Sequence, residues 1–94
     1  MLIVIIKMTA LPEKCLELKQ TILALIEPTR KEKGCLRCDV FEDIENENSF
    51  CLVEYWESRK DLDDHKLSHR FAVLMGTRSL LSREPEIMIN EVSP

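Results

Sequence analysis

The stretch Cys35–Trp56, CLRCDVFEDIENENSFCLVEYW, decides the fold because it predicts two strands joined by a polar turn. Cys35–Asp43 and Ser49–Trp56 have the pattern of strands, and the polar run Glu45–Asn48 between them is typical of a turn. A short turn of this kind joins neighbouring strands that run in opposite directions. The segment therefore predicts an antiparallel β-hairpin.

The residues before the hairpin predict a strand and a long helix. Leu2–Met8 is β-branched, apolar on both faces and too short for a helix. Pro12 suits the first turn of a helix, and Gly34 suits a left-handed stop at its end. Apolar residues at helical spacing line one face between them: Cys15, Leu18, Ile22, Leu25 and Ile26. We expect Pro28 to kink this helix, because its ring removes a backbone donor.

The residues after the hairpin predict a second helix and a last strand. Ser58, with an aspartate three residues later, is typical of a helix N-terminus of the capping-box kind. The apolar pattern then runs from Leu62 to about Ser82 before Pro85 ends it, and Glu86–Val92 predicts a strand. The order βαββαβ predicts an α+β, ferredoxin-like fold with a four-stranded antiparallel sheet and both helices on one face.

Length and composition limit the class of protein. The 94 residues leave room for one domain, which we place at residues 1–94. With 45% hydrophobic and 32% charged residues, the chain is neither collagen-like nor intrinsically disordered. The net charge of -4 argues against binding to nucleic acid or to anionic membranes. The longest apolar run, Leu2–Ile6, is too short to span a bilayer or to form a signal peptide. We therefore expect a cytoplasmic protein.

Apolar residues occupy both faces of the predicted strands. In the first strand, Leu2, Val4 and Ile6 alternate with Ile3 and Ile5. Two helices cover only one face of a four-stranded sheet, so the other face needs a cover. A second copy of the same sheet is the simplest one. We therefore predict a homodimer formed through the sheet faces.

A few residues offer chemistry near neutral pH. His65 and His69 are four residues apart, so they share a face if the helix is continuous. Glu54 and Trp56 point to the same side of their strand as Phe50. A carboxylate on such an apolar face must be paired, protonated or at an edge. If this face meets the helices, the tryptophan, the glutamate and the first histidine border one pocket.

Each of these residues also has a purely structural interpretation. In this interpretation Trp56 fills the core and Glu54 pairs with a basic side chain. Either histidine is then a surface residue or a residue whose hydrogen bonds are satisfied. The two histidines, with an aspartate one turn earlier, also suit zinc geometry, but no further ligand is apparent and Ser68 can end the helix before His69. We therefore expect no native metal.

The pair Cys35-x-x-Cys38 opens a strand, whereas redox-active pairs of this spacing open a helix. Residues three apart on a strand face opposite sides. We therefore expect structural cysteines that stay reduced.

Several motifs together carry a resemblance: Gly34-Cys35-Leu36, Glu54-Tyr55-Trp56-Glu57-Ser58 and His69-Arg70-Phe71, with Leu62 and His65 between them. They resemble the antibiotic biosynthesis monooxygenase family, over nearly the whole chain. The resemblance implies a small dimeric α/β barrel. The family includes cofactor-independent oxygenases of quinols and polycyclic phenols, haem-degrading enzymes and an isomerase. The haem-degrading branch carries an asparagine on its first strand, and Leu2–Lys7 contains none, which argues against haem breakdown.

The resemblance implies a small aromatic or quinol-type substrate and molecular oxygen as co-substrate, with no cofactor. We assign catalytic roles to His65, Trp56 and Glu54, with His69 as the alternative base. Substrate-binding roles are expected for Phe71, His69, Phe50 and Leu62. A base that removes a phenolic proton produces an anion able to give an electron to triplet oxygen, so neither flavin nor metal is required. Glu54 or Asp61 is the carboxylate expected to tune that base.

Two other classes remain open from the sequence. The same fold can serve an oxygen-independent isomerase that moves protons on a small metabolite. It can also serve a dimer that binds a small molecule without turning it over. The identity of the substrate is not readable from the residues.

Overall fold

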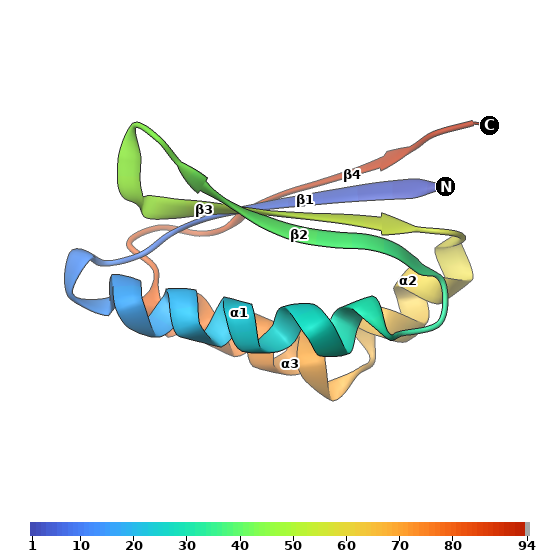
Figure 1. Cartoon of the computed structure of the whole chain (residues 1–94), viewed down its shortest axis with the longest axis horizontal. Coiled ribbons are helices and arrows are strands. Elements are labelled where there is room, and N and C mark those ends of the chain that lie inside the picture. Colours follow the sequence, from blue (N-terminus) through green and yellow to red (C-terminus); the bar gives the residue numbers. More distant parts are fainter. Residues whose placement is uncertain (94) are drawn as a thin grey trace.

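The computed structural model describes residues 1–93, which form one antiparallel sheet covered on one face by helices (Figure 1). The strands are β1 (Leu2–Thr9), β2 (Cys35–Asp43), β3 (Asn46–Trp56) and β4 (Glu86–Glu91). The helices are α1 (Cys15–Arg30), α2 (Arg59–Lys66) and α3 (His69–Gly76), with short 3₁₀ turns at Pro12–Lys14 (η1) and Thr77–Leu80 (η2). The strand order β2-β3-β1-β4 confirms the predicted ferredoxin-like fold.

Strand β1 lies inside the sheet, and its alternation sets the two faces. Leu2, Val4 and Ile6 are buried toward the helices, whereas the residues between them are half-buried on the outer face. In the antiparallel register, Leu2 lies opposite Trp56 and Val4 lies opposite Glu54. Residues opposite each other point to the same side of a sheet. The register therefore brings the tryptophan and the glutamate to the helix-covered face.

The hairpin turn lies two residues earlier than the sequence predicts. Strand β3 begins at Asn46, so the turn consists of residues 44–45. The side chain of Asp43 accepts a hydrogen bond from the backbone N–H of Glu45 at 2.8 Å, and Asn46 does the same for Asn48 at 3.0 Å. These local bonds let polar residues that resemble a turn continue a strand.

Helix α1 continues through Pro28 and ends at Arg30, in the turn that contains this proline. Gly34 then has a φ of +82°, in the left-handed region that glycine adopts most readily. A Cβ atom at this position would lie 2.2 Å from the Asp61 side chain, so Gly34 also allows the chain to pass close to α2. Within residues 1–93, no helix is both long and apolar enough to cross a membrane.

The prediction of a single helix from Ser58 to about Ser82 is wrong, because one helix ends at Lys66 and a second begins at His69. Ser58 accepts from the backbone N–H of Asp61 and begins α2, as expected. Ser68 accepts from the backbone N–H of Phe71 and begins the separate helix α3. A serine cap satisfies the free N–H groups of a new helix and so favours a break. His65 and His69 consequently belong to different helices.

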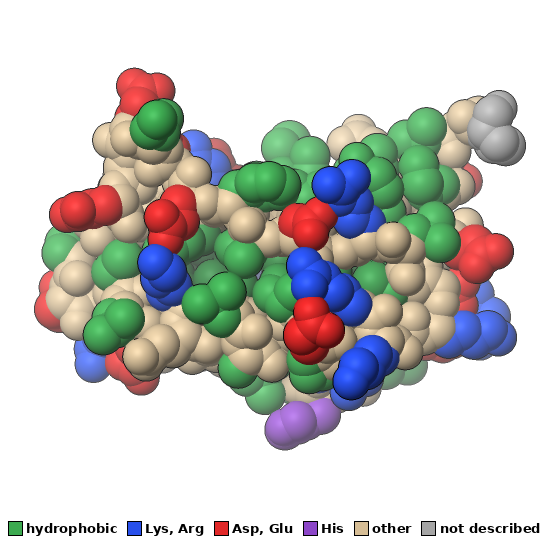
Figure 2. Space-filling model, in the orientation of Figure 1, with side chains coloured by type: hydrophobic (Ala, Val, Ile, Leu, Met, Phe, Trp, Pro, Cys, Tyr) green, Lys and Arg blue, Asp and Glu red, His purple; other side chains and the backbone are tan. Residues whose placement is uncertain are grey.

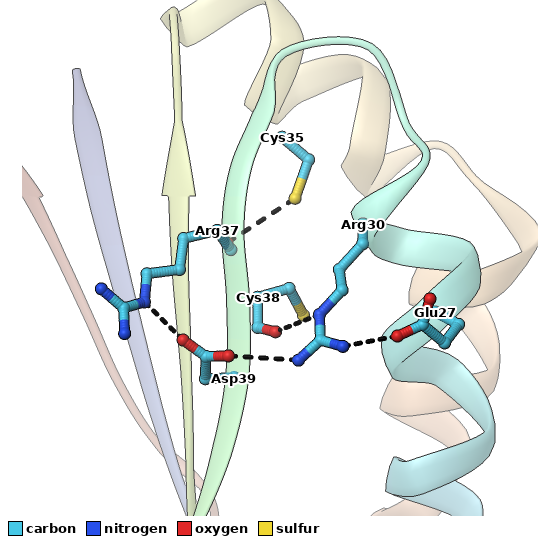
Figure 3. Close-up of polar contacts among 6 residues, drawn as sticks. All are labelled: Glu27, Arg30, Cys35, Arg37, Cys38 and Asp39. Carbon is cyan, nitrogen blue, oxygen red and sulfur yellow. Dashed lines mark hydrogen bonds and ion pairs between the residues drawn. The ribbon is translucent and has the colours of Figure 1, made fainter.

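A β-bulge lies at the start of β2, between Cys35 and Arg37. Cys35 is opposite Trp56 and Cys38 is opposite Glu54, so both thiols are on the helix-covered face. Figure 3 shows both cysteine side chains pointing toward α1 and Arg37 pointing away from it. The expectation that the two cysteines face opposite sides is wrong, because the extra residue of a bulge shifts the alternation. Both thiols are free.

Candidate functional site

Glu54 and Trp56 form the floor of the site on β3. Their side chains are almost fully buried, with exposed fractions of 2% and 0%. The indole Nε1–H of Trp56 donates to Oε1 of Glu54 at 3.0 Å. Burial raises the pKa of the Glu54 carboxyl above its usual range, although the indole bond and His65 oppose the shift. The nearby charge of Glu32 acts in the same direction as burial.

His65 from α2 is held above this floor by aromatic rings. Its ring stacks on Trp56 with centroids 4.6 Å apart and meets Phe71 edge-on at 5.5 Å. Phe71 comes from the first turn of α3. Because only 3% of His65 is exposed, the imidazole has few other positions to adopt.

The two nitrogens of this imidazole have different surroundings. Nδ1 lies 2.8 Å from Oε2 of Glu32, a hydrogen-bond distance. Nε2 lies 3.8 Å from Oε2 of Glu54, which is too long for a hydrogen bond. Within the described chain, Nε2 is the buried side-chain polar atom that has no hydrogen-bond partner. Such an atom is costly in a structural core and is typical of a group that acts on a ligand.

Arg70 holds the second carboxylate of the site. Its Nε donates to the same Glu32 oxygen at 3.1 Å, and this contact raises the pKa of the guanidinium. One carboxylate oxygen therefore serves both His65 and Arg70. The site joins three parts of the chain: the turn after α1, strand β3, and the α2–α3 segment.

A cavity lies between this site and the apolar side chains of α1. His65, Glu54, Phe71 and Arg70 line one side of it. The remaining lining is largely apolar: Ile22, Leu25, Ile26, Thr29, Cys38, Leu52 and Leu74. The cavity is small, with a volume of about 10 Å³ open to water. In this conformation the cavity holds about one water molecule, so an aromatic ligand requires side chains to move.

The structure brings some of the expected residues together and separates others. His65, Glu54 and Phe71 line the cavity. Trp56 is not in the lining, but it stacks on His65 and donates a hydrogen bond to Glu54. The other three lie elsewhere: Leu62 is in the core, His69 is exposed, and Phe50 lines a different hollow.

The hollow that Phe50 lines is at the seam between α1 and β2. Figure 2 shows opposite charges paired along this seam, with hydrophobic atoms exposed between the pairs. Lys19 and Glu42 pair at 2.6 Å, and Arg30 and Asp39 pair at 3.1 Å. Ile22 lines both this hollow and the inner cavity.

Two residues of the site were not found from the sequence. Glu32 lies 33 positions before His65, in a charged run that reads as a solvated helix end. Arg70 belongs to one of the motifs that carry the resemblance, but the sequence assigns it no role. Asp61, which was expected near the imidazole, bonds instead to the hydroxyl of Ser58 at 2.9 Å. No spacing rule connects a turn residue to a helix residue so far along the chain.

The arrangement has the parts of a proton-transfer site. A carboxylate oxygen is an acceptor, so the contact with Glu32 assigns the proton of neutral His65 to Nδ1. This tautomer leaves the lone pair of the buried Nε2 without a partner, beside a carboxyl group whose pKa is raised. Among residues 1–93, no three His, Cys, Asp or Glu side chains gather in an arrangement suited to a metal ion.

The fold and this cavity define a small α+β protein of the ferredoxin-like class with a largely apolar cavity between the sheet and the helices. The family model for antibiotic biosynthesis monooxygenases matches residues 1–75. The chain belongs to this family.

One relative matches most of the chain. The uncharacterized protein sll1783 of Synechocystis sp. (strain ATCC 27184 / PCC 6803 / Kazusa) is 34% identical over 82 residues. This match covers 86% of the chain but 54% of the relative, so the chain spans about half the length of that protein.

Solved structures match over nearly their full length. A conserved protein from Methanosarcina mazei Go1 is 32% identical, with a TM-score of 0.90 over 98% of this chain and 92% of the other. An antibiotic biosynthesis monooxygenase crystal structure is 26% identical, with a TM-score of 0.91 over 100% of both chains. These likenesses support the same fold and family.

Proposed function

We propose that this chain is a cofactor-independent monooxygenase that oxidises a small phenolic or quinol-type substrate with molecular oxygen. The observation that carries the proposal is the buried, unpartnered Nε2 of His65 beside an apolar cavity. Membership of a family named for monooxygenases supports the same reaction class. The substrate would bind with its ring against Phe71 and its hydroxyl toward Nε2.

In the proposed reaction, His65 Nε2 removes the phenolic proton. The phenolate gives one electron to oxygen, and the two radicals combine to form a peroxide on a ring carbon. The imidazolium returns its proton to the peroxide. The base then removes the proton of that ring carbon while the O–O bond breaks, so a carbonyl forms and the departing hydroxide takes up that proton. One oxygen atom enters the product, the other leaves as water, and the substrate supplies all four electrons.

Substrate binding must enlarge the cavity, and the partly exposed side chains are the ones free to move. Phe71 and Arg70 stand in the first turn of α3 and are half-buried, whereas most of the α1 and β3 lining is buried. We expect the start of α3 to move outward when an aromatic ring enters. Comparison of bound and free crystal structures tests this displacement.

The test of the function is oxygen uptake with a panel of quinols, with and without added metal. We expect His65→Ala to lower the rate by about 10²- to 10⁴-fold while the fold is retained. With isotopically labelled oxygen gas, one labelled atom should appear in the product and one in water. His69→Ala is the second arm, because a loss confined to that variant would transfer the role of base to His69. The absence of oxygen uptake by the unmodified protein would refute the proposal.

The carboxyl of Glu54 supports a second candidate, an oxygen-independent isomerase. A base and a carboxyl group with a raised pKa, 3.8 Å apart, can remove a proton from one atom and return it to the next. Substrate proton exchange with deuterated water in the absence of oxygen would favour this reaction. Tight binding without any product would favour a binding protein instead.

We also propose that the chain works as a homodimer in the cytoplasm. The outer face of the sheet carries half-buried and exposed apolar side chains, including Ile3, Ile5, Val53 and Met88. The free cysteines at positions 15, 35, 38 and 51 suit a reducing compartment.

A further inference from the structure

Glu32 is fixed more firmly than its position in a turn suggests. Its backbone N–H donates to Thr29 at 3.0 Å, and its carbonyl accepts from Cys35 at 3.1 Å. Its carboxylate is only 13% exposed and contacts His65 and Arg70 through a single oxygen. A side chain that is bonded at both backbone and carboxylate holds its partner at a defined angle.

The Glu32 carboxylate lies at the boundary between two spaces. His65 and Arg70 line both the inner cavity and an outer polar groove, whereas Glu32 lines only the groove. The groove also contains Lys31, Lys33 and Asp64, and the centres of water-sized spheres fit into about 550 Å³ of it. The two imidazole nitrogens therefore meet different spaces: Nδ1 bonds to a carboxylate at the wet groove, and Nε2 is buried near Glu54.

We propose that Glu32 is a positioning residue that holds the proton of His65 on Nδ1 and thereby keeps Nε2 available as the base. The proposal rests on the function proposed above, because it assigns how the base of that reaction is prepared. When Nε2 takes the substrate proton, the charge of Glu32 stabilises the imidazolium from the other side. Arg70 donates to the same oxygen and keeps the carboxylate in place.

The position of Glu54 explains why a second carboxylate is needed to hold the proton of His65 on Nδ1. His65 lies between two carboxyl groups, with Glu32 at Nδ1 and Glu54 at Nε2. Without Glu32, the ring proton has its nearest acceptor at Glu54 and moves to Nε2. That tautomer turns the lone pair away from the cavity, and the base is lost.

The experiment measures the tautomer directly in the substrate-free protein. Nitrogen NMR of ring-labelled His65 is recorded over a pH series and read where the ring is neutral. In the unmodified protein we expect Nδ1 to carry the proton and Nε2 to have the shift of an unprotonated nitrogen. A proton found on Nε2 would overturn the proposal, whatever the variants do.

Three variants separate positioning from general structure. In Glu32→Leu we expect the proton to move to Nε2 and the rate to fall by about 10²- to 10⁴-fold. In Glu32→Gln the amide oxygen still accepts from Nδ1, so the tautomer is retained and the rate is intermediate. Asp64→Asn is the matched control, since it removes a charge from the same groove at a residue that pairs with Lys60 rather than His65. We expect it to change neither the tautomer nor the rate.

The outcomes distinguish this proposal from the oxygenase proposal. An unchanged tautomer in Glu32→Leu, or equal rate losses in Glu32→Leu and Asp64→Asn, would overturn the role of Glu32. If Glu32→Leu does not fold, the unmodified protein and Glu32→Gln decide, because a proton on Nε2 in either contradicts the proposal. If the tautomer behaves as expected but no quinol is oxidised, the oxygenase fails and the positioning role stands.

Discussion

At the scale of single residues, Glu54 combines a titratable group with nearly complete burial. Burial raises its pKa above 4.5, so the folded protein holds this proton more tightly than the unfolded chain does. Between the ordinary and the raised value, the folded state binds more protons. The free energy of unfolding therefore falls as pH rises through that window.

Glu54→Gln is expected to remove this pH dependence and to stabilise the protein at neutral pH. The amide oxygen still accepts from Trp56, but no charge remains to be buried. The gain in the free energy of unfolding should be largest above the raised pKa of Glu54 and vanish below its ordinary pKa. Urea unfolding at a series of pH values measures it.

Glu57→Gln is the matched control for this prediction, since the residue lies three positions further on and is exposed. It should leave the free energy of unfolding nearly unchanged. A Glu54→Gln protein that is less stable than the unmodified one at neutral pH would show that the charged carboxylate is favourable where it lies.

Cys38 gives a second prediction at this scale. Burial and the charge of Glu54 raise the pKa of its thiol to about 12. The thiolate is the reactive form, so Cys38 should resist alkylation at pH 8 in the folded protein. Cys15, which is only partly buried at the start of α1, serves as the comparison. Mass spectrometry after timed iodoacetamide treatment should find Cys15 modified at least tenfold faster, and equal rates would contradict the burial of Cys38.

Local residue patterns predicted one half of the site and not the other. Glu54 and Trp56 are two residues apart on one strand, so the two-residue period of a strand places both side chains on the same face. Glu32 and Arg70 meet His65 only because the turn after α1 and the start of α3 pack together. That packing depends on the whole fold, and a run of charges in the sequence does not reveal it.

At the scale of elements, the approach of α2 to the α1–β2 turn depends on Gly34. Gly34→Ala would place a Cβ 2.2 Å from Asp61 in a backbone conformation that disfavours side chains. We expect a loss of about 2 to 4 kcal/mol in the free energy of unfolding. Chemical denaturation measures this loss.

Gly76→Ala is the matched control at the end of α3. Its backbone is right-handed helical, and no other atom lies within 4 Å of the new Cβ. The substitution should stabilise the protein by about 0.5 kcal/mol because it lowers the entropy of the unfolded chain. Two alanine variants of equal stability would indicate that Gly34 is not constrained.

The element boundaries show what periodicity can and cannot predict. Every strand was predicted, because short apolar runs between polar turns identify strands. The break between α2 and α3 lies at Ser68, which the sequence offers only as an alternative end of the helix, because apolar spacing continues across it. The bulge between Cys35 and Arg37 became apparent only from the pairing with β3.

At the scale of the whole molecule, the outer sheet face is an apolar surface that the helices leave uncovered. Ile5 lies at its centre, opposite Val53 on one side and Met88 on the other. Met88 itself is exposed. A second copy that covers this face would remove these side chains from water, which favours association.

We therefore expect a dimer at micromolar concentration by size exclusion with light scattering. Ile5→Glu should yield monomers, because it places a charge at the centre of the proposed interface. Leu67→Glu is the control, since Leu67 is 87% exposed between α2 and α3, on the opposite side of the molecule. A monomeric unmodified protein, or a dimer that Ile5→Glu leaves intact, would refute the sheet-face dimer.

The fold class was predictable at this scale because the order of elements permits few arrangements. The size of the cavity was not, since it depends on how closely Phe71 and Leu74 approach β3. The sequence indicated apolar side chains near an imidazole, and the structure adds that the cavity between them has room for about one water molecule.

The edge of the sheet at β2 has one more consequence. Arg30 reaches around this edge and donates to the backbone carbonyl of Cys38 at 2.9 Å, while it also pairs with Glu27 and Asp39 (Figure 3). With bulges near both ends of β2 as well, this border offers a poor template for an incoming strand. The β4 edge is the regular one, because β4 pairs with β1 without a bulge. Two copies can therefore join through their β4 edges. The β2 edges that remain at both ends are then poor templates for a further strand. We therefore expect the sheet to resist growth into fibrils.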